Sequence, residues 1–234
     1  MAAKLLGALY TYHTHALYVG PLIAAARHKH HAGQVIWAPD GVQVTGEDGC
    51  PRRVTLYAVP PHVPHGHGPA AAAAVLWVDR DDLRWGPHPT RLPEQPLASP
   101  ITPEVADALA KTLLELVMPT DGGTCTLQHP AVKRMHALLD AKAAEAEISV
   151  GQLARQSGLS TRQLRHRFTQ ELGINPSAYR RWRRLRRAMA AIAGGATLTQ
   201  AALEGGFADG AHFSRVFLAQ FGMAPSQAFS AVRF

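Results

Sequence analysis

The chain has 234 residues, 47% of them hydrophobic, and a formal net charge of +7, a size that allows one or two ordinary cores. No run of about 18 apolar residues occurs and the first ten residues are too polar for a signal peptide, so we expect a cytoplasmic protein without a membrane partner. Two cysteines, Cys50 and Cys125, are too few for a disulfide framework.

Residues from about 10 to 90 have the pattern of β-strands. Val35–Trp37 and Val42–Val44 flank the turn signal Pro39-Asp40-Gly41, which predicts two strands joined by a turn. Two further β-prone runs cover residues 53–59 and 73–78. We therefore expect a β-domain over residues 1–100.

Nine histidines precede residue 90, and three of them have a distinctive spacing. His28 and His30 are two positions apart, which on one strand places both side chains on the same face. His65 follows in a proline- and histidine-rich segment. These segments resemble the two sequence motifs of metal-binding cupin β-barrels, with Gln34 where those proteins have a carboxylate. The resemblance implies a cupin-like barrel over residues 10–85.

The group His28, His30, Gln34 and His65 has three interpretations at this point. It lines a pocket for a small organic effector, it binds a divalent metal ion, or its members satisfy one another at the mouth of the barrel. A cupin metalloenzyme fused to a DNA-binding domain is the alternative function. Because no carboxylate completes the ligand shell and no general acid or base adjoins the motifs, we expect no enzymatic activity.

A proline-rich connector over residues 87–103 leads to a predicted helix at 103–117. Its apolar positions recur at spacings of three and four: Val105, Leu109, Thr112, Leu113, Leu116 and Val117. This face either packs against the β-domain or forms a dimer seam, so residues 101–120 are expected to serve interdomain packing or dimerisation.

The second half of the chain contains an internal repeat. The pattern of residues 149–179 returns in residues 197–229. The matching positions are Gly158-Leu159 and Gly206-Phe207, Leu164 and Phe213, Phe168 and Phe217, Gly173 and Gly222, and Pro176-Ser177 and Pro225-Ser226. Each copy has the pattern of a short helix, a glycine turn and a second helix, which is typical of a helix-turn-helix DNA reader.

Capping residues stand at the helix starts that this repeat requires. A hydroxyl residue is followed three positions later by glutamine, the spacing of a capping box, in Ser149 with Gln152, Ser160 with Gln163, and Thr197 with Gln200. Asp209 is the expected cap of the last copy's second helix. Such starts leave free amides that favour phosphate.

The second helix of each copy has an apolar inner face and an outer face. The inner positions are Leu164, Phe168 and Leu172 in the first copy, and Phe213, Phe217 and Phe221 in the second. Arginine and glutamine read guanine and adenine edges, which suits an outer face turned to the major groove. The predicted base contacts on the outer faces are Arg162, Gln163, Arg165, His166, Ala211, Ser214 and Arg215.

A helix predicted over residues 177–193 joins the copies. Its apolar stripe is Tyr179, Trp182, Leu185, Met189 and Ile192, and six arginines cover its other sides. From His129 onward 15 Lys and Arg stand against 6 Asp and Glu, whereas the residues before it have 9 against 11. A basic half beside a slightly acidic one indicates a phosphate-binding partner. We predict phosphate contacts by Ser160, Arg181, Arg184 and Arg187, with the two readers roughly 34 Å apart along the DNA.

Residues 129–229 resemble the DNA-binding domain of the AraC/XylS family of bacterial transcription regulators. The resemblance is carried by Leu153-Ala154, Ser157-Gly158-Leu159-Ser160, Leu164, Phe168, Leu172-Gly173, Pro176, Tyr179, Arg184-Leu185, Ala188, Gly206-Phe207, His212-Phe213-Ser214-Arg215, Phe217, Phe221-Gly222 and Pro225-Ser226. It implies that the base-facing positions are Arg162, Arg165, His166, Ala211 and Arg215. Gly205 departs from the pattern, since the family has a larger residue before Gly206, and this predicts a softer second reader.

We therefore predict a two-domain α+β protein. A cupin-like β-barrel forms the sensor domain, and residues 126–234 form an AraC-type DNA-binding domain with two helix-turn-helix units joined by a linker helix. The expected function is transcription regulation through double-stranded DNA and RNA polymerase, controlled by a small-molecule or metal effector, with a homodimer as one option.

Overall fold

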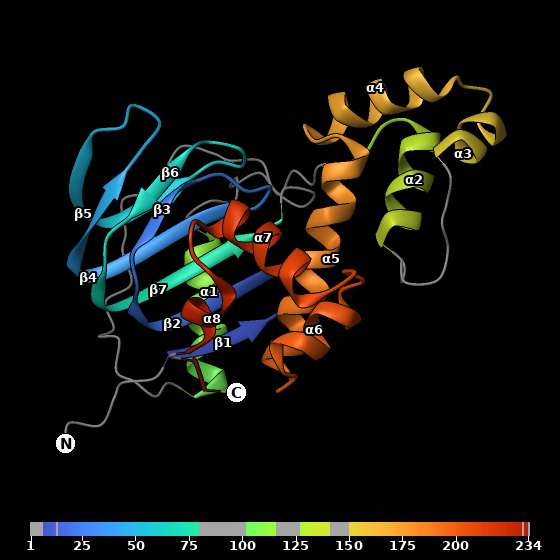
Figure 1. Cartoon of the computed structure of the whole chain (residues 1–234). Coiled ribbons are helices and arrows are strands. Elements are labelled where there is room, and N and C mark those ends of the chain that lie inside the picture. The colour runs from blue at the N-terminus through green and yellow to red at the C-terminus, as the bar shows by residue number, and fades with distance from the viewer. Residues whose placement is uncertain are drawn as a thin grey trace. The chain divides into compact units, whose positions relative to one another are not determined.

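A computed structural model describes residues 7–12, 14–79, 102–115, 127–140, 150–230 and 232–233 (Figure 1). Several features named above lie outside these ranges: the predicted connector up to residue 101, the capping box at Ser149, and the residues His13, His88 and Cys125. No helix within them is long and apolar enough to cross a membrane.

The chain divides into two compact units. Unit 1 comprises residues 1–124, 193–195 and 214–234, and unit 2 comprises residues 125–192 and 196–213. The predicted DNA-binding domain was continuous to residue 234, whereas this division assigns the last 21 residues to the unit that holds the β-strands. The domain limits at 100, 120 and 126 stay a prediction.

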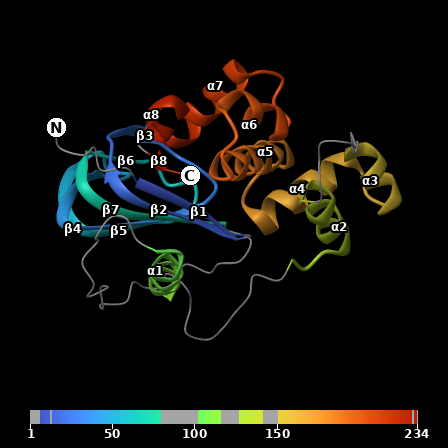
Figure 2. The same cartoon turned by 90° about the horizontal axis from the view of Figure 1, so that it is seen from below.

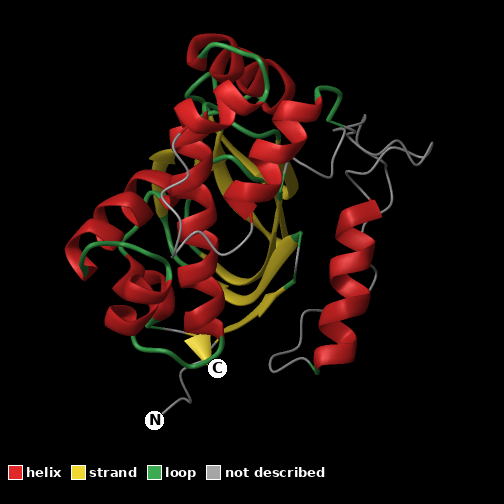
Figure 3. Ribbon diagram, turned by 90° about the vertical axis from the view of Figure 1, so that its right-hand side faces the viewer, coloured by secondary structure: helices red, strands yellow, loops and turns green. Residues whose placement is uncertain are grey.

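Unit 1 is built on one twisted eight-stranded sheet (Figure 3). Its strands are β1 (Gly7–Thr11), β2 (His15–Leu22), β3 (Ala25–His28), β4 (Gly33–Thr45), β5 (Pro51–Val59), β6 (His65–His67), β7 (Ala70–Val78) and β8 (Val232–Arg233). The order is β3-β6-β4-β7-β2-β1-β8, and β5 pairs with β4. Every pairing among them is antiparallel except that of β1 with β8. The predicted cupin-like β-domain is confirmed, and β8 adds a strand to it from the far end of the chain.

The predicted turn at Pro39-Asp40-Gly41 is wrong. The strand β4 runs through these residues, and its register with β5 shifts between Trp37 and Val42, so the three residues lie within a bulge at 38–41. Long-range pairing of β4 on both edges outweighs the local turn signal. Arg53 secures the bulge by donating a hydrogen bond to the carbonyl of Asp40 at 2.6 Å.

Helix α1 (Pro103–Glu115) packs on one face of the sheet, and α8 (Pro225–Phe229) lies at the other face (Figure 2). Leu109 and Leu113 are buried against strand residues such as Leu17 and Leu76, which confirms the packing interpretation of this helix. Val105 is 40% exposed, so its predicted inward position is wrong. The buried stripe is completed by small residues, Ala106 and Ala110, which allow a close approach of the helix to the sheet.

Unit 2 contains the first helix-turn-helix and the linker helix. Its helices are α2 (Pro130–Asp140), α3 (Val150–Gln156), α4 (Thr161–Leu172), α5 (Pro176–Ala193) and α6 (Leu198–Glu204), and the first residues of α7 (Gly210–Phe221). The inner residues of α4 and the predicted stripe of α5 are all buried, as expected. Glu171 accepts backbone hydrogen bonds from Gln128 and His129, which fixes the start of α2 against the end of α4.

Gly205 allows α6 to approach α5 closely. A Cβ at this position would lie 2.8 Å from the carbonyl oxygen of Arg184 and 2.9 Å from the Cβ of Ala188. The glycine is therefore a packing requirement of this chain. The departure of Gly205 from the family pattern is therefore no reason to expect a softer second reader.

Candidate functional site

The first reader (residues 150–172) begins its second helix with the predicted capping box. The Ser160 hydroxyl accepts from the Gln163 amide at 3.2 Å, and the Gln163 side-chain oxygen accepts from the Ser160 amide at 2.9 Å. The helix ends at Gly173, whose φ is 65° and whose N–H donates to the Thr169 carbonyl. Both ends of α4 are thus fixed by local hydrogen bonds, which orients its outer face.

That outer face is exposed where base contacts were predicted. Arg162, Arg165 and His166 are exposed, whereas Leu164 and Phe168 between them are buried. Gln163 is exposed too, but its oxygen is held in the capping box and only its amide N–H groups remain for a base. Arg167 is exposed as well, so the helix presents three guanidinium groups and one imidazole to solvent.

The second reader (residues 198–221) carries a smaller and less charged face. Thr197 and Gln200 form the second predicted capping box, and the Asp209 carboxylate accepts from the His212 amide at 2.6 Å. On α7, Ala211 and Arg215 are exposed and Ser214 is half-buried. Arg215 is the one guanidinium group in the described length of α7.

The linker arginines divide into two classes. Arg181 is exposed on α5, whereas Arg184 and Arg187 are half-buried. The side chain of Arg184 lies over the turn at Gly206, with its Nε 3.6 Å from where a Cβ of that glycine would stand. Of the three arginines predicted to bind phosphate, Arg181 is therefore the most accessible to a DNA backbone.

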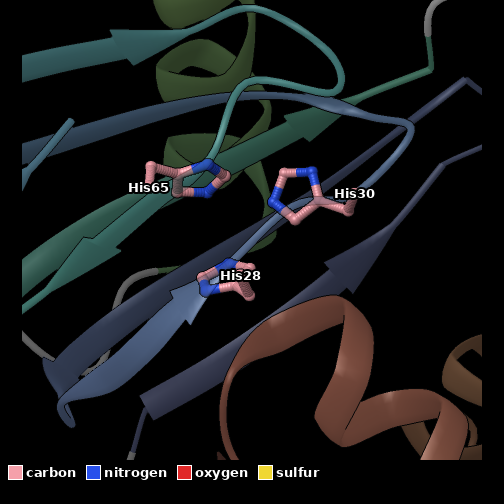
Figure 4. A group of neighbouring side chains, drawn as sticks. All are labelled: His28, His30 and His65. Atoms are coloured by element: carbon pink, nitrogen blue, oxygen red, sulfur yellow. The ribbon is translucent and has the colours of Figure 1, made fainter. Parts of the chain in front are cut away.

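Three histidines converge in unit 1, from three separate segments (Figure 4). His28 ends β3, His65 begins β6, and His30 lies in the connection to β4. The ring centroids are 4.4 Å apart for His28 and His65, 4.8 Å for His30 and His65, and 5.4 Å for His28 and His30. The prediction that one strand presents His28 and His30 is wrong, because β3 ends at His28, yet the loop still brings the two rings together.

Gln34 completes this histidine cluster, which we define as His28, His30, Gln34 and His65. Its side-chain oxygen lies 2.8 Å from His30 Nε2 and 2.9 Å from His65 Nε2. All four residues are buried. Burial lowers the pKa of His30 to about 3 and of His28 to about 4, and it also lowers the pKa of His65. The neighbouring imidazoles contribute to the lowered pKa of His30 and His28, so at neutral pH the rings are uncharged, the form that binds metal ions.

The remaining described histidines lie outside this cluster. His31 and His62 contact each other, with ring nitrogens 3.2 Å apart, and His15 stacks on Tyr12 at 4.2 Å. His67 is buried on β6, and burial lowers its pKa to about 4. Of the described histidines in the β-domain, three therefore converge in one cluster and the others make separate contacts.

Known proteins match both parts of the chain. Residues 153–231 match the family model described as a helix-turn-helix domain. A probable AraC family transcriptional regulator from Rhodopseudomonas palustris is 30% identical, over 44% of this chain and 96% of its own, with a TM-score of 0.38. A transcriptional regulator with an AraC-type DNA-binding domain from Chromobacterium violaceum is 31% identical, over 43% of this chain and 90% of its own, with a TM-score of 0.39. Each of these two relatives is at least 30% identical to this chain over 90% or more of its own length, and this identity establishes the family of the chain.

The chain belongs to the AraC family of transcription regulators. ToxT from Vibrio cholerae is similar over 94% of this chain and 100% of its own, with a TM-score of 0.59 and 9% identity, which is a likeness of fold. None of the curated proteins matches. As an AraC-type regulator the chain binds DNA, and the two-domain architecture of a β-domain followed by a helical reader domain is confirmed.

The helix that begins after Ser160 depends on its N-terminal capping box, and this dependence can be tested. Ser160→Ala is expected to lower the free energy of unfolding by about 1 kcal/mol, because the Gln163 amide loses its acceptor. Urea denaturation followed by far-UV circular dichroism measures this change.

Ser157→Ala is the matched control, three residues earlier. The Ser157 hydroxyl oxygen is buried and has no hydrogen-bond partner in the described residues, so its removal is expected to leave stability unchanged or to raise it slightly. Equal losses in both variants would show that the capping box contributes nothing of its own.

That the end of α7 lies beside the histidine cluster was not predicted from the sequence. Phe221 lies 5.7 Å from the His30 ring and 6.0 Å from the Trp77 ring, between centroids. The carbonyl of Gly222 accepts a hydrogen bond from the Ala26 amide at 3.1 Å. The repeat marks Gly222 as a helix end, but no local signal predicts that this helix end lies beside β3.

Proposed function

We propose that this AraC family member is a sequence-specific transcription regulator whose DNA affinity is controlled by an effector bound in the β-domain. The observation that carries the DNA part is the exposed polar face of α4, framed by a capped start and a buried apolar face. The buried histidine cluster supports the effector part. Within the described residues this cluster contains no carboxylate, which argues against the alternative of a metalloenzyme.

Base reading is assigned to the exposed faces of both second helices. We propose contacts by Arg162, Gln163, Arg165 and His166 in the first reader, and by Ala211, Ser214 and Arg215 in the second. Arginine pairs bidentately with guanine, histidine and serine donate or accept single hydrogen bonds, and the alanine methyl suits the methyl group of thymine. Because the first face is more polar, it supplies more of the hydrogen-bonded readout.

Phosphate contacts by Ser160, Arg181, Arg184 and Arg187 belong to the same proposal, and Arg181 gives its clearest test. Arg181→Ala is expected to reduce the slope of log affinity against log salt by about one, with little change in sequence preference. Arg181→Lys keeps the charge and should keep the slope. If the alanine variant retains the wild-type slope in fluorescence anisotropy titrations, Arg181 does not contact the DNA.

The effector is a small organic molecule or a metal ion. An organic effector is favoured by ToxT, of which a structure with an unsaturated fatty acid bound is known, and a metal ion is favoured by the histidine cluster. Thermal shift of the full chain with a fatty-acid series and with divalent metal ions separates the two. Contact with RNA polymerase and formation of a homodimer are further parts of the proposed function.

Selection from a random double-stranded DNA pool by the full chain tests the proposal as a whole. We expect a defined motif to be enriched by the wild-type protein, and a double variant, Arg165→Ala/Arg215→Ala, to enrich no motif under the same conditions. Equal, unselective binding of both proteins would refute sequence-specific regulation by these two helices.

A further inference from the structure

The three histidine rings are held by the same kind of hydrogen bond. The Nδ1 atoms of His28, His30 and His65 lie 2.7, 2.7 and 2.8 Å from the carbonyl oxygens of residues 26, 32 and 63. A carbonyl oxygen only accepts, so each Nδ1 carries the proton. A neutral imidazole has one such proton, which leaves Nε2 of every ring as a lone-pair atom.

Gln34 brings a further lone-pair atom into the cluster. Its oxygen lies within 2.9 Å of Nε2 of both His30 and His65. Three lone-pair atoms repel one another unless a cation lies between them or the amide turns its NH2 group toward the rings. The turned amide has two N–H groups, enough for these two rings only. One cation between Nε2 of all three rings and the Gln34 oxygen includes His28 as well.

We propose that Nε2 of His28, His30 and His65 and the oxygen of Gln34 bind one divalent first-row transition metal ion, and that this ion fixes the end of α7. The inference names the effector of the proposed function and therefore rests on it. Imidazole nitrogen suits zinc, iron, nickel and copper, and each Nδ1 donating to a carbonyl is the outer-shell arrangement that orients such ligands.

The spacing of the ligands explains how metal binding acts on the protein. One nitrogen from each ring lies within 4.8 Å of the others. Ligands about 2.1 Å from one tetrahedral ion lie about 3.4 Å apart, a separation between the Gln34 contacts of 2.8 and 2.9 Å and the limit of 4.8 Å. Binding thus draws the rings together and holds His28, whose Nδ1 donates to the carbonyl of Ala26.

Ala26 links the cluster to the end of α7. Its carbonyl accepts from His28 and its N–H donates to the carbonyl of Gly222. Gly222 has a φ of 67°, and a Cβ there would lie 2.2 Å from the Ala26 oxygen and 2.8 Å from His28 Nδ1. Only glycine permits this contact, and Phe221 before it contacts His30. A metal ion that holds His28 therefore stabilises the contact of residues 221–222, and with it the end of the helix that carries Arg215.

Zinc is the probe for the metal site, with the full-length chain. We expect about one zinc ion per chain by elemental mass spectrometry after chelation, reloading and desalting, and a loss of affinity above about 100-fold in His28→Ala/His65→Ala. His28→Gln, a milder change, covers the case in which the double variant does not fold. His62→Asn is the control, since His62 lies outside the cluster and asparagine tolerates its positive φ of 66°. Zinc absent from the wild type, or equal in wild type and cluster variants, overturns the proposal.

Hydrogen exchange tests the link to α7. Zinc is expected to slow exchange of the Ala26 amide and of amides in residues 218–224 in the wild type. Gly222→Ala places a Cβ against the Ala26 carbonyl and the His28 ring, so this variant should lose the zinc-dependent protection of residues 218–224. Zinc binding without any change of exchange in these residues would overturn the coupling.

The two proposals fail in different ways. A chain that selects a DNA motif but binds no zinc contradicts the metal site and leaves the proposed regulator intact. A chain that binds zinc but selects no DNA motif contradicts the proposed function, and with it the regulatory meaning of the metal site.

Discussion

Phe168→Ala is expected to lower the free energy of unfolding of the helical unit by about 3–5 kcal/mol. Phe168 is fully buried in the core of unit 2, and its ring meets that of Tyr179 edge to face at 5.5 Å. The truncation leaves a cavity beneath the outer face of α4, so DNA binding should be lost together with stability. Urea denaturation and anisotropy titration of the same preparations measure both effects.

Gln170→Ala provides the matched control two residues along the same helix. Gln170 is exposed, and alanine is a good helix former, so stability is expected to stay within about 0.5 kcal/mol of the wild type. A Phe168→Ala variant as stable as this control would mean that α4 does not pack on the core through Phe168.

Arg215→Ala is expected to cost about 1–3 kcal/mol in affinity for the selected site, concentrated at one base position. The reason is that Arg215 is the exposed guanidinium of α7, and the other two predicted base contacts on this helix, Ala211 and Ser214, have small side chains. A second selection with the variant should recover the wild-type motif except at that position.

Arg215→Lys distinguishes a base contact from a phosphate contact. Lysine keeps the charge but lacks the planar fork of donors that pairs with guanine. We expect the lysine variant to keep the salt dependence and to lose part of the base preference. A uniform loss on all sequences in the alanine variant, restored by lysine, would assign Arg215 to a phosphate.

The helical reader was predictable from the sequence because its signals are local. The boundaries of α3 and α4 follow from Ser160, from Gly158 and from the spacing of Leu164, Phe168 and Leu172. Each of these acts within one or two helical turns, where capping and amphipathic periodicity decide the structure. The same holds for the stripe of α5.

The β-domain was less predictable because its structure depends on distant pairings. Pro39-Asp40-Gly41 has the local signature of a turn, yet β4 continues through it because β4 pairs with β5 on both sides of these residues. The convergence of His28, His30 and His65 was predicted, but from a strand geometry that His30 does not have. The contact of Gly222 with Ala26 joins residues 196 positions apart, and no periodicity or motif in the sequence predicts such a contact.

Hydroxyl-radical footprinting of the selected duplex locates both readers on one DNA molecule and so shows directly whether the chain reads two segments. We expect two separate protected segments, with Arg165→Ala weakening protection of one and Arg215→Ala weakening protection of the other. A single protected segment, or equal weakening of both segments by either substitution, would contradict a regulator that reads DNA with two helix-turn-helix units.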